Sequence, residues 1–212
     1  MSSRPVPVDP ANPDLPEVPP CPAWLVPRRA TFAEGHHRSH LTEEDGGHLA
    51  ADGVIDGAAL FPIRHANLLR GAEGLDIGGL TGRLRNGEDP LDFVAATGDP
   101  DRAMDAETVI FLCPAGTAAE GVTALPNGYF AGDLTPFELL TLARHLETAH
   151  GLRLFGIGAP LVAFVTDAPL SAAGARRVAD DLAPLYADAA LTDRLCTALT
   201  GRDALILTYT GG

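Results

Sequence analysis

The residues best suited to metal chemistry gather between positions 36 and 48. Four histidines and three acidic residues lie there; they are His36, His37, His40 and His48, with Glu43, Glu44 and Asp45. His36 and His40 are four residues apart, which places both imidazoles on one face of a helix if a helix forms there. A neighbouring carboxylate, Glu43, completes a two-histidine, one-carboxylate ligand set. The pattern therefore predicts a divalent-metal site of the kind that metal-dependent hydrolases or oxygenases use.

Three glycines argue against a rigid helix in this stretch. Gly35 precedes the first histidine, and Gly46 and Gly47 would interrupt a helix before His48. Glycine weakens a helix because it loses the most backbone freedom on folding. A solvated histidine-rich loop that holds no cofactor is therefore the alternative interpretation, and the sequence leaves both open.

A second pair of histidines stands near a glutamate, at His145, Glu147 and His150. The order is H-L-E-T-A-H rather than the H-E-x-x-H of zinc proteases. Five residues of helix separate the two imidazoles by about 140° around the axis. We therefore expect that they cannot chelate one metal from a single helix face, and that they serve instead as late-helix residues favourable to the helix dipole.

Several common reaction types lack the residues that they need. The sequence contains no lysine, which excludes a Schiff base and a phosphate-loop lysine. None of its four serines stands in G-x-S-x-G, and its three cysteines are too far apart for a zinc-knuckle pattern. Gly156 and Gly158 do not complete a dinucleotide-binding fingerprint, because Pro160 blocks the helix that must follow. These absences favour a protein that is not an enzyme, without catalytic or cofactor-binding residues.

The elements that position such residues are clearest in residues 133–212. Thr135, Pro136 and Glu138 form the start signal of a helix, and Gly151 closes it. Two apolar strands between 152 and 165 meet at a hairpin, a helix capped by Ser171 follows, and leucines every four residues predict another before a strand at 204–209. The predicted fold class is α+β, a mixed or antiparallel sheet with helices packed on one face.

The first half of the chain is less regular. Residues 1–28 are rich in proline, which predicts an extended arm before a single domain at 29–212. Within that domain we expect a short strand at 59–61 that Pro62 ends, helical turns at 65–70, a helix at 90–96 capped by Asp89, and a strand at 108–113.

The order of elements in residues 134–209 resembles a bacterial domain of unknown function. The matching stretches are 139–158, 166–186 and 191–209, where a helix ending in glycine leads into Gly-Leu-Arg-Leu-Phe-Gly-Ile-Gly and an apolar strand. The final strand, Leu-Ile-Leu-Thr-Tyr, departs from that family, in which tryptophans are expected. The resemblance implies a fold, and it brings no activity, cofactor or catalytic residue to this chain.

Charge and composition favour a binding role. The formal net charge is −13, from 28 acidic and 15 basic residues. Such a surface repels nucleic acid and anionic membranes and suits a basic protein partner. Without a signal peptide or a long apolar run, we expect a cytoplasmic protein. We therefore predict an accessory, regulatory or immunity-type protein-binding domain; the alternatives are a metal-dependent enzyme using residues 36–48, or an assembly component that grips a neighbour with its arm.

Overall fold

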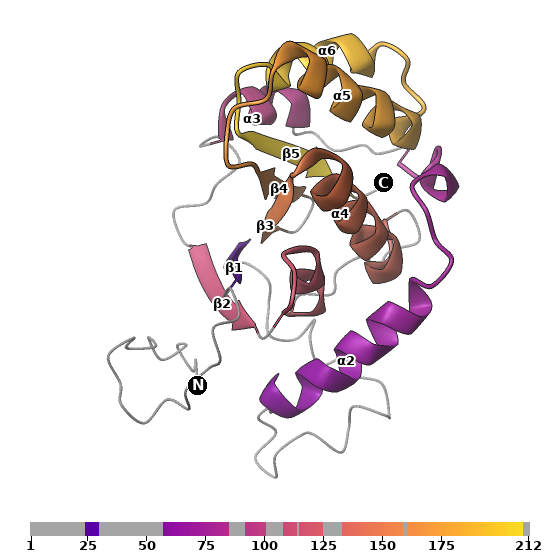
Figure 1. The fold of residues 1–212 in the computed structure, drawn as a ribbon, viewed down its shortest axis with the longest axis vertical. Coiled ribbons are helices and arrows are strands. Elements are labelled where there is room, and N and C mark those ends of the chain that lie inside the picture. The colour runs from indigo at the N-terminus through magenta and orange to yellow at the C-terminus, as the bar shows by residue number, and fades with distance from the viewer. Residues whose placement is uncertain are drawn as a thin grey trace.

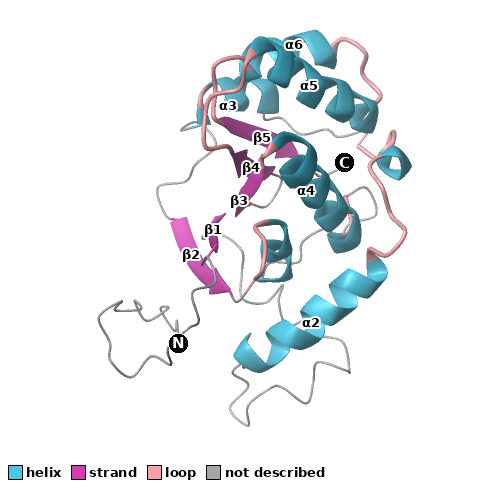
Figure 2. Cartoon of the chain, in the orientation of Figure 1, coloured by secondary structure: helices cyan, strands magenta, loops and turns pink. Residues whose placement is uncertain are grey.

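The computed structural model describes residues 24–29, 57–84, 92–100, 108–113, 115–124, 133–158 and 161–209. Their arrangement is shown along the chain in Figure 1 and by secondary structure in Figure 2. None of the described helices is long and apolar enough to cross a lipid bilayer.

A three-stranded antiparallel sheet lies at the centre of the regular half. Its strands are β3 (Arg153–Ile157), β4 (Leu161–Val165) and β5 (Ala204–Thr208), in that spatial order. The β3–β4 pair confirms the predicted hairpin, with an irregularity in register between Leu154 and Gly156. Side chains alternate along each strand, so Phe164 and Leu205, which are register partners, enter the main core together.

Three helices share that core with one face of the sheet. They are α4 (Pro136–His150), α5 (Ala172–Tyr186) and α6 (Leu191–Leu199). In Figure 1, α5 and α6 lie side by side, and α4 lies beneath them beside the sheet. The α+β class with an antiparallel sheet is thereby confirmed.

The start and end of α4 follow the sequence signals. Thr135 Oγ1 accepts a hydrogen bond from the Glu138 amide at 3.3 Å, and the Glu138 carboxylate accepts one from the Thr135 amide at 2.8 Å. This is the predicted capping box. Gly151 ends the helix with φ at 68°, in the left-handed region that glycine adopts without strain.

Helix α3 (Phe93–Gly98) covers the outer edge of β5. Thr97 Oγ1 donates to the Ile206 carbonyl at 2.9 Å and accepts from the Ile206 amide at 3.1 Å. Both groups of this edge residue are therefore paired without another strand. The helix begins later than predicted, because Asp92 rather than Asp89 caps it, accepting from the amides of Val94 and Ala95.

The N-terminal half contains a two-stranded antiparallel sheet. It pairs β1 (Trp24–Arg29) with β2 (Thr108–Cys113), and Trp24 is the partner of Cys113. The strand predicted at 108–113 is confirmed. At the end of the segment predicted as an extended arm, residues from Trp24 onward form a paired strand that includes Pro27. A two-stranded sheet consists of edge strands, where proline is tolerated.

Helix α2 (Gly57–Gly71) replaces the strand expected at 59–61. Pro62 lies inside this helix and does not end the element. Proline removes one hydrogen bond, to the carbonyl of Ala58, but its fixed φ is compatible with helix. The helical turns predicted at 65–70 belong to α2. Two short 3₁₀ helices, η2 (Gly78–Leu80) and η4 (Ala119–Ala124), complete the described elements of this half.

Candidate metal centre

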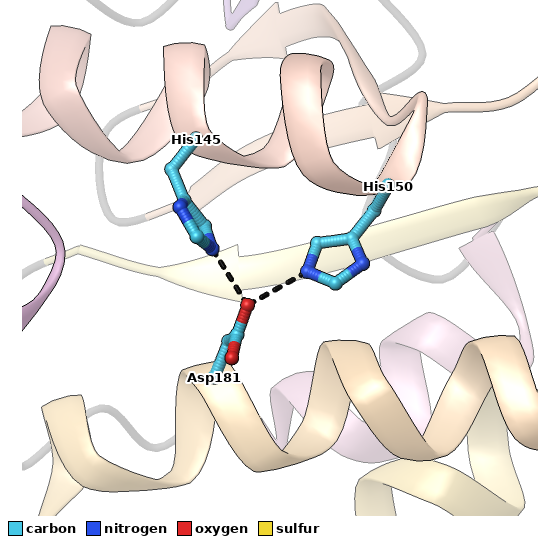
Figure 3. A group of neighbouring side chains, drawn as sticks. All are labelled: His145, His150 and Asp181. Carbon is cyan, nitrogen blue, oxygen red and sulfur yellow. Dashed lines mark hydrogen bonds and ion pairs between the residues drawn. The ribbon is translucent and has the colours of Figure 1, made fainter.

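Helices α4 and α5 bring together three side chains of metal-ligand type. His145 Nε2 lies 2.6 Å and His150 Nε2 lies 2.8 Å from the same oxygen, Oδ2 of Asp181. Figure 3 shows both imidazoles of α4 pointing toward the carboxylate that rises from α5. One ligand atom from each residue lies within 4.8 Å of the others, and within the described ranges this is the only group of three or more such residues. We call these three residues the His-His-Asp site.

This convergence corrects the expectation drawn from helical spacing. The angle of about 140° describes where the two side chains leave the helix, not where their ring nitrogens end. The two rings can converge because both reach away from α4 toward one atom, Oδ2 of Asp181, on the facing helix. Their ring centroids are 5.6 Å apart, in an edge-to-face arrangement. The two histidines are therefore not only late-helix residues near the dipole.

Burial differs across the His-His-Asp site. The side chain of His150 is 6% exposed, that of His145 is 25% exposed and that of Asp181 is 36% exposed. One side of the site therefore lies in the protein, and the other side is reached by solvent. A metal ion has an entry path from the carboxylate side.

The carboxylate of Asp181 is held in its ionised form. Burial on its own raises the pKa of Asp181, but hydrogen bonds and charge from His145 and His150 outweigh burial, and this pKa lies below its ordinary value. An ionised carboxylate only accepts hydrogen bonds, so each Nε2 carries the proton that it donates. Asp181 is thus ready to act as an anionic ligand at neutral pH.

The glutamate between the two histidines has a different partner. Glu147 accepts hydrogen bonds from the amides of Ala118 and Ala119, at 3.4 Å and 3.1 Å, at the start of η4. It therefore caps the 3₁₀ helix and fixes it against α4. The resemblance to a zinc-protease motif has no counterpart in the structure, because this carboxylate is committed away from the His-His-Asp site.

Contacts at the opposite end of α4 hold the helix in place. Arg83 donates from Nε to Glu138 Oε1 at 2.6 Å and from a terminal nitrogen to Glu138 Oε2 at 3.0 Å. The same guanidinium donates to the Asp133 carbonyl at 2.7 Å. Burial alone raises the pKa of Glu138, but the hydrogen bonds from Arg83 and Thr135 outweigh burial and lower it. The start of α4 is thereby fixed to the segment after η2.

That same segment also fixes the end of α5, which carries Asp181. The amides of Gly82 and Leu84 donate to the carbonyls of Pro184 and Leu185, at 2.8 Å and 2.9 Å. These carbonyls belong to the last turn of the helix, which needs external donors. Residues 82–84 therefore contact both helices that supply ligands to the His-His-Asp site.

The observed separations are those of hydrogen bonds, and a metal needs slightly longer ones. Zinc lies at about 2.0–2.2 Å from nitrogen and oxygen ligands, which puts neighbouring ligand atoms about 3.3–3.6 Å apart in tetrahedral geometry. The Asp181 oxygen would have to retreat from both imidazoles by about 0.5–1 Å. Rotation of a side chain that is partly exposed can provide such a shift.

The site predicted from the sequence uses other residues. His36, His40 and Glu43 fall outside the described residues, so that metal site stays a prediction. Asp181 was missed, because it stands 36 and 31 residues after the two histidines and belongs to no local motif. The only signal was the pair His145 and His150 on a helix that must pack against a later one.

Comparison with known proteins adds no relative. No protein-family model matches the chain, and no curated protein and no solved structure matches it. The resemblance of residues 134–209 to a bacterial domain of unknown function therefore stays a prediction.

Proposed function

We propose that this protein binds one divalent transition-metal ion through His145, His150 and Asp181. The observation that carries the proposal is the convergence of three ligand atoms, from two helices, within 4.8 Å of one another. Two imidazole nitrogens and one carboxylate favour zinc, iron or a similar ion over magnesium and calcium, which prefer oxygen ligands. Three protein ligands leave at least one coordination position for water.

The second carboxylate oxygen supports this proposal. Both histidines approach Oδ2 of Asp181, and Oδ1 accepts no hydrogen bond from the described residues. A carboxylate that served only to join two histidines could accept one hydrogen bond on each of its two oxygens, but here both histidines bond to the same oxygen. A metal ion can bind both Nε2 atoms once each neutral imidazole carries its proton on Nδ1 instead, and it then takes either carboxylate oxygen without breaking any other contact of Asp181.

Titration of metal-stripped protein tests the proposal. The full-length chain is treated with a chelator, dialysed, and titrated with zinc chloride in a calorimeter, with elemental analysis of the loaded protein. We expect binding at His145, His150 and Asp181, and each of His145→Ala, His150→Ala and Asp181→Asn should lower the affinity by more than about 100-fold, since even second-shell changes cost 10–100-fold.

A matched control is available in His65. Its Nε2 lies 3.4 Å from Glu120 Oε2, so it is also a histidine beside a carboxylate, but it does not belong to the His-His-Asp site. His65→Ala should leave the affinity unchanged. A double variant, His36→Ala with His40→Ala, tests the site predicted from the sequence. If this variant loses the metal while Asp181→Asn keeps it, the proposal is wrong and the upstream prediction gains support.

A further inference from the structure

We infer that the metal ion acts as a clamp that holds the α5–α6 pair against α4; this inference rests on the proposed metal site. Two ligands, His145 and His150, belong to α4, and the third, Asp181, belongs to α5. An ion bound to all three joins two helices that are otherwise separate along the chain. The ion thus regulates how firmly this layer of the fold is closed.

The polar contacts between the two helices are confined to this point. Across the described residues, the hydrogen bonds between α4 and α5 are the two that Asp181 accepts. The remaining contact is apolar, through the shared core to which Leu146 and Leu182 belong. Figure 3 shows the two helices facing each other across the His-His-Asp site.

Helices α5 and α6 behave as one packed unit. They lie against each other along their lengths in Figure 1, and the side chains of Val178, Leu182, Leu195 and Leu199 are completely buried. Arg176 of α5 also pairs with Asp193 of α6, at 2.8 Å on the surface. Separation of α5 from α4 therefore takes α6 with it.

Coordination changes the cost of that separation. Water replaces the two hydrogen bonds of Asp181 when the helices part, because the site is partly exposed. A metal ion with ligands on both helices cannot stay fully bound in the parted state. By linkage, the population of that state falls by the factor 1 + [L]/Kd, which is about 100-fold at a zinc concentration 100 times Kd.

Hydrogen exchange on the full-length chain tests the clamp. Exchange is followed by mass spectrometry with zinc chloride at about 100 times the measured Kd, and again with chelator. We expect amides of α5 and α6 to exchange about 100-fold more slowly with zinc, while those of α2 keep their rates, because local opening follows packed units. In Asp181→Asn zinc should change no rate; His145→Gln provides a second variant if the first does not fold.

The outcomes separate the clamp from the metal site itself. If zinc does not bind in the calorimeter, the proposed function fails and the clamp fails with it. If zinc binds with the expected dependence on Asp181 but α5 and α6 exchange at unchanged rates, the clamp alone is overturned. Equal slowing in all regions, α2 included, also overturns the clamp, because the ion would then stabilise only the fully folded chain.

Discussion

At the scale of single residues, Asp181 determines what the His-His-Asp site can do. One carboxylate oxygen holds two imidazoles, which fixes both rings and keeps them within reach of a common ion. The same contacts lower the pKa of Asp181, although burial acts in the opposite direction. The residue therefore contributes to stability through its charge even without a metal.

Replacing Asp181 with asparagine tests that contribution. A carboxyl whose pKa is lower in the folded state stabilises the fold above its unfolded pKa, and the effect is lost as pH falls through the folded pKa. Asp181→Asn should therefore lower the free energy of unfolding by about 1–2 kcal/mol at pH 7, a value kept small because the carboxylate is partly exposed. Urea unfolding with chelator present measures this difference.

The same unfolding measurement at acidic pH can contradict this prediction. Since the ordinary pKa of this group is 3.8 and the folded value is lower, the difference between the two proteins should shrink as the pH falls below that value. A difference that stays constant into that range would mean that the carboxylate acts through shape rather than through charge.

At the scale of elements, local sequence signals predict the structure correctly where a few neighbouring residues decide the outcome. The capping box at Thr135, the cap at Ser171 and the left-handed Gly151 are contacts within one or two turns, so the sequence shows them directly. Asp89 is predicted as a cap because Pro90 follows it at the first helical position. Asp92 caps the helix instead, and Thr97 of that helix bonds to Ile206. No local pattern records that contact.

The cap of α4 gives a prediction at this scale. Thr135→Ala removes the acceptor of the Glu138 amide and should lower the free energy of unfolding by about 1 kcal/mol. Thr148→Ala is the matched control, because Thr148 Oγ1 donates to the carbonyls of Arg144 and His145 in the preceding turn and caps no amide. Urea unfolding measures both variants. Equal effects in the two would argue against a specific role of the cap.

The hydrogen bonds at the edge of β5 give a second prediction at the scale of elements. Thr97→Val keeps the shape of the side chain but leaves the amide and carbonyl of Ile206 without their partner. Thr97 is completely buried, so water does not replace the hydroxyl and the cost should be about 1–3 kcal/mol. The control is Thr197→Val at an exposed position of α6, which should change stability by less than about 0.5 kcal/mol. A neutral Thr97→Val would show that α3 is held by apolar packing alone.

At the scale of the whole molecule, the sequence predicted the class of fold but not the site. The periods of apolar residues and the caps identify the helices and strands, and these elements pack as an α+β fold because each must bury its apolar face. The His-His-Asp site depends on which faces of α4 and α5 meet, and no residue spacing within either helix contains that information. The arm at 1–28, apart from the strand from Trp24, the basic partner and the protein-binding role stay predictions.

Metal binding should be visible in the stability of the entire chain. An ion that binds the folded state alone stabilises it by about 2.7 kcal/mol at 100 times Kd. For a chain of this size, that corresponds to a rise of about 5–10 °C in Tm. We expect this rise with zinc, none with magnesium because two of the three ligands are nitrogens, and none in Asp181→Asn. Calorimetric melting of chelated and loaded protein measures it, and a rise that persists in Asp181→Asn would place the ion outside the His-His-Asp site.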